Sequence, residues 1–317
     1  MASRLAPYLM LVLANLCWSG NWVTGRAIRG SFEPLGLCFW RWAVALAVLA
    51  PFVLPRLRRV LPALRRSWGL LLLLSFAGLV AFQSLVYLGL RSTTAVNAVL
   101  LNATGPLFVI LCSWALDGET ASRRRIAGML ISFVGVFVIL SGGHVQALLH
   151  LDLGIGDAWI LLAMLLWGLY SVLLRRLPRG LEGSSLLFVL AALAVAQLLP
   201  LYLLEAVLIG EPAPTLGAAA AVVYVGVFAS VVAFMAWNDA VARLGAHVAG
   251  FSMHLMPAFG TILAILVLGE TLRPYHLVGF AAILAGVLTA TAKGRRQLPV
   301  VVESMGAQLE RPDITQS

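Results

Sequence analysis

Polar side chains recur inside the long apolar runs of this chain. In hydrocarbon, an amide, hydroxyl or imidazole group normally faces other protein groups or a water-filled cavity. With the aromatic residues beside them, these groups could line a cavity for a small molecule. The candidate cavity residues are Asn15, Trp18, Gln83, Tyr87, Asn102, Trp167, Tyr170, Ser230, Trp237 and His254. For any one of the polar residues, a hydrogen bond between helices is the alternative interpretation.

Two ionisable residues inside apolar runs suggest more specific chemistry. An imidazole can titrate near neutral pH, so His254 could couple protons to solute movement. It could equally donate a hydrogen bond to a solute carboxylate or pack in the core. A charge such as that of Arg41 is unfavourable inside a membrane. The first interpretation is that Arg41 extends outward or fastens the end of a helix, and contact with a bound anion is the alternative.

Motifs for catalysis are missing from the sequence. The chain has no nucleotide-binding loop, no cluster with metal-ligand spacing and no nucleophile elbow. Its three cysteines, Cys17, Cys38 and Cys112, all fall in apolar runs. We therefore expect no enzyme activity and no cofactor. A membrane-embedded enzyme or lipid-handling protein is a disfavoured alternative, because His254 has no titratable partner at its depth.

The composition is that of a polytopic membrane protein. Of 317 residues, 61% are hydrophobic and 11% are charged, whereas soluble domains carry about 25% charged residues. Runs of about 20 apolar residues can cross a membrane as helices. The sequence predicts an all-α fold with ten spans, at about 7–27, 33–54, 68–90, 93–115, 122–141, 155–175, 184–208, 216–238, 245–268 and 271–292.

Basic residues set the expected orientation. The net charge is +9, but the basic residues sit in short clusters between the apolar runs, which is typical of membrane flanks rather than of nucleic-acid binding. The largest clusters lie at 56–66, 123–125, 175–179 and 293–296. The positive-inside rule then places both termini in the cytoplasm of a cell-membrane protein.

One stretch of the chain occurs twice. Residues 95–139 align without a gap on residues 246–290, at an offset of 151, and ten of the 45 pairs are identical. The shared residues include Pro106 with Pro257 and the tripeptide at 118–120 with that at 269–271. An internal duplication is the simplest explanation.

The duplicated residues have expected structural roles. A proline inside a helix removes a hydrogen bond and bends the axis, so Pro106 and Pro257 are candidate hinges. Glu119 and Glu270 precede helices, and a carboxylate there can cap a helix N-terminus. The paired glycines seven residues apart favour close helix contact. They are Gly128 with Gly135 and Gly279 with Gly286.

The duplication divides the chain into two five-helix repeats, 1–145 and 150–293, followed by a tail at 297–317 that we expect to be disordered. Because five is odd, the second repeat must enter the membrane from the side opposite to the first. Inverted repeats of this kind are common in secondary transporters, whose binding sites lie near the midplane.

The motifs resemble those of the drug/metabolite transporter superfamily, in its EamA-type branch. Trp18-Ser19-Gly20-Asn21 and Arg26 belong to the first span, and Phe39-Trp40-Arg41-Trp42-Ala43 to the second. The resemblance covers residue 7 to about 293. It implies export of amino acids, related metabolites or drug-like compounds through a central cavity, with a small molecule and the lipid bilayer as partners. Possible proton coupling stays open, and uptake of a sugar or nucleotide-linked metabolite is the alternative.

Overall fold

The computed structural model describes residues 2–28, 32–93, 101–144, 146, 154–177, 183–210, 215–268 and 273–291. Within these ranges the chain forms helices joined by turns, without a strand. Glu270 and the tail at 297–317 lie outside the described residues.

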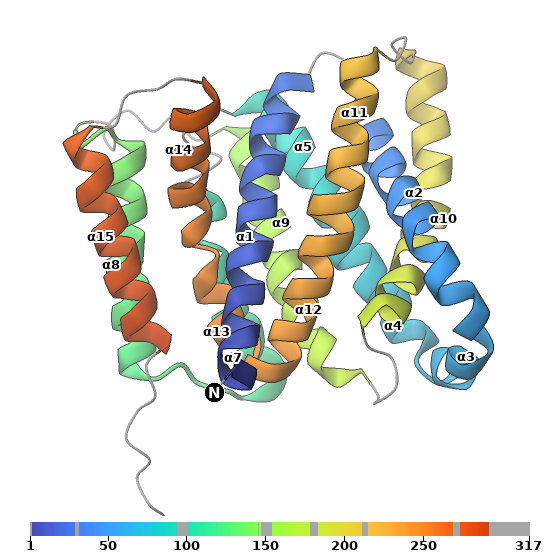
Figure 1. The fold of residues 1–317 in the computed structure, drawn as a ribbon, viewed down its shortest axis with the longest axis horizontal. Helices are drawn as coiled ribbons and strands as arrows, with labels where there is room; N and C mark the ends of the chain where they lie inside the picture. The colour runs from blue at the N-terminus through green and yellow to red at the C-terminus, as the bar shows by residue number, and fades with distance from the viewer. Residues whose placement is uncertain are drawn as a thin grey trace, which may run out of the picture.

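The helices follow the predicted spans in chain order (Figure 1). The first half contains α1 (Ala2–Ile28), α2 (Pro34–Val53), α3 (Leu57–Arg66), α4 (Trp68–Leu74), α5 (Phe82–Ser92), α7 (Gly105–Asp117) and α8 (Arg123–Leu140). The second half contains α9 (Ile155–Leu173), α10 (Gly183–Ile209), α11 (Leu216–Tyr224), α12 (Ala233–Leu244), α13 (Ala246–Ser252), α14 (Leu255–Leu268) and α15 (Pro274–Thr291). The short connecting helix α3 has no counterpart among the predicted spans.

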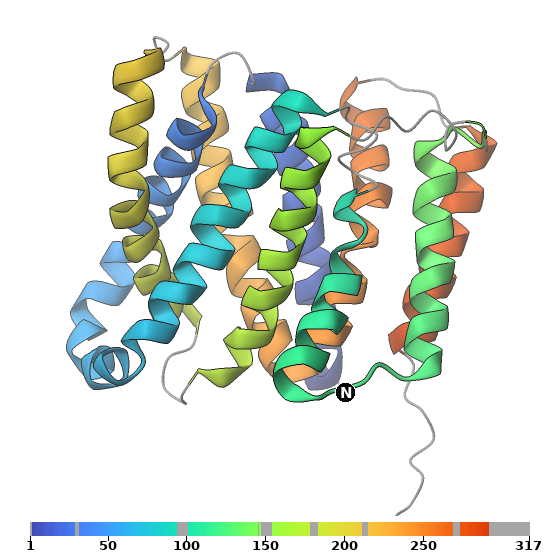
Figure 2. The same ribbon diagram turned by 180° about the vertical axis from the view of Figure 1, so that it is seen from behind.

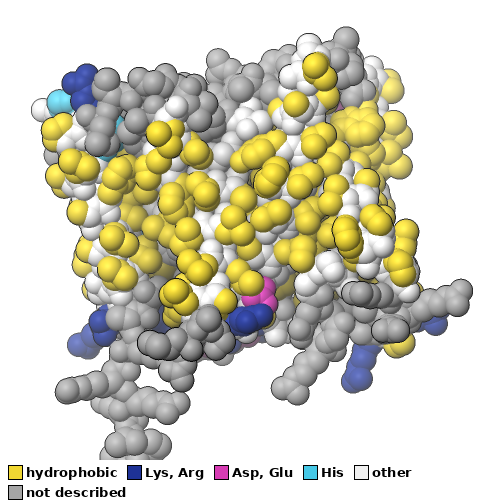
Figure 3. All heavy atoms as spheres, viewed as in Figure 1, with side chains coloured by type: hydrophobic (Ala, Val, Ile, Leu, Met, Phe, Trp, Pro, Cys, Tyr) yellow, Lys and Arg dark blue, Asp and Glu magenta, His cyan; other side chains and the backbone are white. Residues whose placement is uncertain are grey.

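The outer surface matches a multi-pass membrane protein. Five described helical stretches are long and apolar enough to cross a membrane, and Gly105–Asp117 and Pro274–Ala290 are shorter apolar helices. Exposed leucine, valine and aromatic side chains cover the sides of the bundle. The basic side chains visible in Figure 3 lie mostly along the lower edge, where α1 begins and α15 ends. We call this edge the N-terminal face.

The two halves share one core. The largest helix contacts join α8 to α15, α2 to α10, α5 to α9, α7 to α9, α1 to α12 and α1 to α14. Each of these pairs takes one helix from each half. Exchanging the halves converts the α5–α9 pair into the α12–α1 pair, and the α7–α9 pair into the α14–α1 pair. The contacts therefore follow a pseudo-two-fold relation between the repeats.

The α8–α15 pair shows that the repeats are inverted. A Cβ on Gly135 would lie 2.7 Å from the Gly279 carbonyl oxygen, and one on Gly128 would lie 2.5 Å from that of Gly286. Ser132 Oγ also donates to the Ile283 carbonyl at 3.0 Å. Residue numbers rise along one helix as they fall along the other, so the helices are antiparallel, as Figures 1 and 2 also show. The inverted-repeat prediction is confirmed, and the glycines make the close contact expected of them.

The fourth and ninth spans are interrupted rather than bent. Turns replace the helix at Ala103–Thr104 and at Met253–His254. Pro106 and Pro257 then lie in the first turns of α7 and α14, where a missing N–H leaves no intrahelical bond unmade. The sequence placed each proline inside a continuous kinked helix, whereas the structure places the break two to four residues before the proline.

The third and eighth spans each contain a π-helical segment, at Ser75–Ala81 and Val225–Val232. The repeat offset carries the first segment onto the second. Long π-helical segments are rare and occur frequently at functional sites. Glycines allow close approach here, because a Cβ on Gly78 would lie 2.6 Å from Tyr170 Cγ.

Candidate functional site

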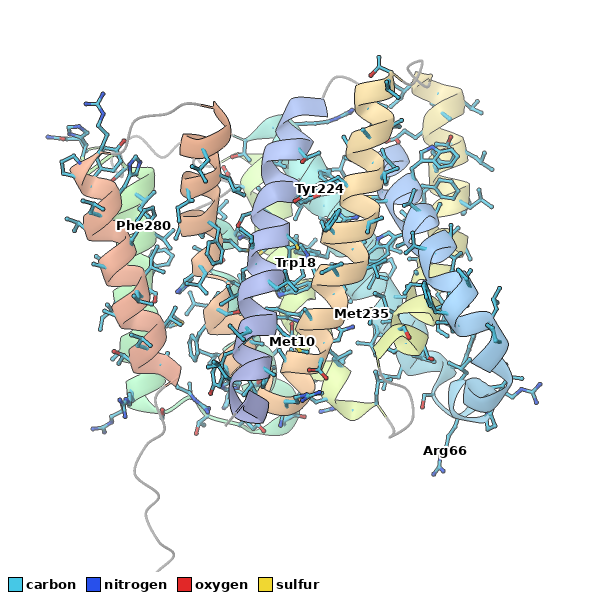
Figure 4. The ribbon with its side chains drawn as sticks, viewed as in Figure 1. Met10, Trp18, Arg66, Tyr224, Met235 and Phe280 are labelled. Atoms are coloured by element: carbon cyan, nitrogen blue, oxygen red, sulfur yellow. The ribbon has the colours of Figure 1, made fainter. Side chains whose placement is uncertain are left out.

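An aromatic cluster occupies the middle of the bundle. Trp18 of α1, at mid-height in Figure 4, lies 5.2 Å from Trp167 and 5.3 Å from Trp237, ring centroid to ring centroid. Trp167 and Trp237 are 5.1 Å apart. Tyr170 and Phe234 complete the group. The four predicted candidates Trp18, Trp167, Tyr170 and Trp237 therefore come together from both repeats. The three indole rings contact one another, and Tyr170 contacts Trp167.

Some hydrogen-bond donors in and beside this cluster have an acceptor, and others have none in the described part of the chain. Trp18 Nε1 donates to the Ala229 carbonyl at 3.0 Å, and Tyr170 O–H donates to Asn238 Oδ1 at 2.8 Å. In contrast, Trp167 Nε1, Trp237 Nε1 and Asn238 Nδ2 are buried and have no acceptor in the described part of the chain. A buried donor left without a partner costs about 1–3 kcal/mol. Such groups are therefore candidates for contact with a bound molecule.

Arg41 is the centre of a polar network beside this cluster. Its side chain is fully buried. Nε donates to Ser230 Oγ at 2.9 Å, and Nη1 donates to Gln83 Oε1 at 2.8 Å and to Tyr87 Oη at 3.2 Å. Nη2 reaches the Ala229 carbonyl at 3.3 Å. The expectation that Arg41 extends outward is wrong, because partners on the third and eighth spans hold its side chain inside the bundle.

The Ala229 carbonyl links the two groups. This carbonyl accepts from both Trp18 Nε1 and Arg41 Nη2. It belongs to the π-helical segment Val225–Val232. Ser230, which holds Arg41 Nε, lies in the same segment. The π-helical segment thus presents its backbone and side-chain oxygens to the site, a feature that apolar periodicity does not reveal.

The broken ninth span is fastened to α1. Asn15 Nδ2 donates to Ser252 Oγ at 2.9 Å, and Ser19 Oγ donates to the Met256 carbonyl at 3.0 Å. Asn15 Oδ1 is buried without a donor among the described residues. Asn102 is buried and its Nδ2 lies 4.0 Å from Met256 Sδ. The candidates Asn15 and Asn102 therefore lie at the helix breaks.

His254 lies at the break itself. Its ring is fully buried, and Nε2 donates to the Ala103 carbonyl at 2.9 Å. Because a carbonyl only accepts, Nε2 carries the proton. Nδ1 has no partner among the described residues.

Charged residues join the halves at the N-terminal face. Arg175 Nη1 and Nη2 bind the two oxygens of Glu119 at 2.9 and 2.8 Å, and Arg176 binds Asp117 at 2.5 Å. Hydrogen bonds from the Arg175 guanidinium lower the pKa of Glu119 below its usual value. Ser122, not Glu119, caps α8, and its side chain accepts from the Arg125 N–H. The cap predicted for Glu119 is thus wrong, because the carboxylate turns to the facing arginine instead.

The described candidates form three neighbouring groups: the aromatic cluster, the Arg41 network with Gln83, Tyr87 and Ser230, and the helix breaks with His254. Together they offer one buried positive charge, several N–H donors and aromatic faces. This chemistry suits the binding of a small molecule with an anionic or acceptor-rich part.

Known proteins resemble this chain along most of its length. The model of the EamA-like transporter family matches residues 5–141 and again 154–292. A protein of Streptantibioticus cattleyicolor named as a probable terminal-alkyne amino-acid exporter is 30% identical over 295 residues, which cover 90% of this chain and 94% of that protein. An uncharacterized transporter of Archaeoglobus fulgidus is 28% identical over 289 residues, covering 90% and 97%.

A solved crystal structure shows the same fold. Its chain is 24% identical in sequence and superposes with a TM-score of 0.74, covering 92% of this chain and 99% of that one. The family model matches each repeat in turn, and its two matches cover most of the sequence. This protein belongs to the EamA-like transporter family.

Proposed function

We propose that this protein is a secondary transporter that exports amino acids or related small metabolites by alternating access. The observation that carries the proposal is the buried site to which both repeats contribute. Trp18 and Arg41 come from the first repeat, and Trp167, Ser230 and Trp237 from the second. A site between inverted repeats near mid-depth is the arrangement that alternating access requires.

The chemistry of the site favours an amino acid as substrate. A carboxylate matches the buried guanidinium and the N–H donors, and an apolar or aromatic side chain matches the indole faces. The relative from Streptantibioticus cattleyicolor, named as a probable amino-acid exporter, supports the same class.

The conformational change would use the interrupted helices. At Ala103–Thr104 and Met253–His254 the helical hydrogen-bond ladder is already broken, so the flanking segments can turn relative to each other with few further bonds lost. In this conformation the Glu119–Arg175 pair joins the halves at the N-terminal face. Because the repeats are inverted, exchanging their conformations would open one face as it closes the other.

We further propose that the protein lies in the cell membrane with both termini in the cytoplasm. Arg66, Arg123, Arg175 and Arg243 belong to the helix ends at the N-terminal face, which supports this orientation under the positive-inside rule. Labelling of single cysteines in intact cells tests it. A residue of the N-terminal face that reacts with an impermeant reagent added outside would contradict the orientation.

Counterflow in proteoliposomes tests the proposed function. Vesicles containing the purified protein are loaded with an unlabelled amino acid, and entry of the labelled amino acid is followed with and without a pH gradient. A sugar and a nucleotide sugar serve as the alternative loads, and protein-free vesicles give the background. We expect counterflow with at least one amino acid. Counterflow with the sugar loads alone would contradict the proposal.

A further inference from the structure

A buried arginine without a counter-charge is the most unusual feature of the site. In the described part of the chain, the four hydrogen bonds of the Arg41 guanidinium are to neutral oxygens, and no ion pair includes it. Its Cζ also lies 5.5 Å from the centroid of the Trp42 ring, which is neutral too. On the facing helix, Glu205 uses its two oxygens to accept from the Leu35 and Gly36 N–H groups. A lone charge inside a membrane protein is costly unless a partner compensates it.

A purely structural role does not explain the charge. Arg41 does fasten the second, third and eighth spans together through Ser230, Gln83 and the Ala229 carbonyl. Neutral amides and hydroxyls join helices elsewhere in the bundle, as Asn15 does with Ser252. A neutral side chain could make such contacts without the cost of burying a charge.

We propose that Arg41 binds the carboxylate of the transported substrate, an inference that rests on the proposed function and names the group that the site recognises. A guanidinium matches a carboxylate with two parallel hydrogen bonds. The two longest contacts of Arg41, to Tyr87 Oη at 3.2 Å and to the Ala229 carbonyl at 3.3 Å, involve one terminal nitrogen each. The substrate carboxylate replaces these two contacts when the bundle opens.

Neighbouring groups fit the rest of an amino acid. Ala229 is also bound by Trp18 Nε1, so the guanidinium lies next to the aromatic cluster. The indole N–H groups of Trp167 and Trp237 are buried donors without an acceptor in the described chain. Asn15 Oδ1 is a buried acceptor without a donor there. An amino acid supplies acceptors on its carboxylate and donors on its ammonium group.

Competition between acids and their amides tests the proposal. Phenylalanine and leucine, and in parallel phenylalaninamide and leucinamide, compete with counterflow of whichever labelled amino acid the wild-type protein exchanges. At pH 6 the α-amino groups of acids and amides are protonated, because an α-amino group next to an amide has a pKa of about 7.7–8.0 and a free carboxylate raises that pKa further. Only the carboxylate then differs. We expect the wild-type protein to prefer the acids by about 10- to 100-fold, as for a charged hydrogen-bonded pair.

Variants separate recognition from structure. Arg41→Gln should bring the acid-to-amide preference to within about 3-fold, whereas Arg41→Lys, which keeps the charge, should retain part of it. Ser132→Ala is the matched control, because it removes a buried hydroxyl that joins α8 to the Ile283 carbonyl outside the site, and it should leave the preference unchanged. If Arg41→Gln does not fold, the wild-type preference and the Arg41→Lys and Ser132→Ala values still decide the question.

The outcomes are distinct. A wild-type protein that exchanges amino acids without preferring acids to amides would overturn the inference and leave the proposed function standing. Retention of the full preference in Arg41→Gln, or a loss in Ser132→Ala equal to that in Arg41→Lys, would also overturn it. A wild-type protein that exchanges no amino acid would overturn the proposed function, and the inference with it.

Discussion

His254 and Ala103 hold equivalent positions in the two repeats, and His254 Nε2 donates a 2.9 Å hydrogen bond to the Ala103 carbonyl. Both residues lie where the helix of their span is interrupted. The bond therefore joins the two breaks to each other across the pseudo-two-fold axis. Only one repeat supplies the side chain, so the contact is asymmetric although the backbone around it is nearly symmetric.

The His254 bond predicts a structural role for the imidazole in this conformation. A second proton on Nδ1 would have no acceptor among the described residues. We expect His254→Ala to lower the free energy of unfolding by about 1–3 kcal/mol and to slow exchange. The rate of exchange by the His254→Ala variant should depend on a pH gradient in the same way as that of the wild-type protein. Loss of that dependence in His254→Ala, measured in the same vesicles, would instead assign proton coupling to this residue.

The close packing of α8 against α15 at their glycines predicts that an added methyl group destabilises the fold. A Cβ on Gly135 would meet backbone atoms of Gly279 and Ile283 at 2.7 Å, and backbone cannot move aside as a side chain can. Gly135→Ala should therefore lower the free energy of unfolding by about 1–3 kcal/mol and lower the melting temperature in detergent by several degrees. Gly69→Ala is the matched control, because its Cβ would meet no atom within 4 Å. Equal melting temperatures for the two variants would contradict the packing.

Two tryptophans of the central cluster should behave differently. Trp18→Phe removes an N–H that donates to the Ala229 carbonyl. We expect this variant to lower the free energy of unfolding by about 1 kcal/mol. Trp167→Phe removes an N–H without a partner in the described chain. It should therefore lower the free energy of unfolding less than Trp18→Phe does, and it should weaken substrate binding more. Melting temperature and the KM for counterflow measure the two effects. The reverse order would show that the Trp167 N–H does not face the substrate.

The Glu119–Arg175 pair predicts a pH-dependent contribution to stability. Arg175 lowers the pKa of Glu119, so the pair stabilises the fold above the unfolded pKa of about 4.3. That contribution is lost as the pH falls through the lower folded value. Because the pair is partly exposed, its contribution should stay below about 1 kcal/mol.

Melting curves of the wild-type protein and Glu119→Gln at several pH values check this. Their difference should be present at pH 6 and shrink below about pH 4. Arg176→Gln, which leaves Glu119 and Arg175 intact, is the control and should preserve the pH dependence attributed to Glu119. A difference that grows as the pH falls would contradict the assignment.

The sequence predicts the fold better than the site. Apolar runs and the duplicated stretch are local patterns, so they indicate the inverted repeats and a close helix contact at the paired glycines, but not that Gly135 meets Gly279. The direction in which the Arg41 side chain points depends on Gln83 and Ser230, which belong to distant spans. No local pattern in the sequence indicates that these residues contact Arg41. The π-helical segments likewise depend on close packing, as between Gly78 and Tyr170. A proline marks a broken helix but does not fix which preceding residue carries the turn.

Spin-label distances across the two faces test alternating access most directly. One label pair at Ala121 and Leu177 spans the halves at the N-terminal face, and another at Thr24 and Arg273 spans them at the opposite face. When vesicles containing the labelled protein are supplied with an exchanged amino acid, we predict that one distance lengthens while the other shortens. If both distances stay constant, or change in the same direction, while exchange proceeds, the alternating movement of the two inverted halves is contradicted.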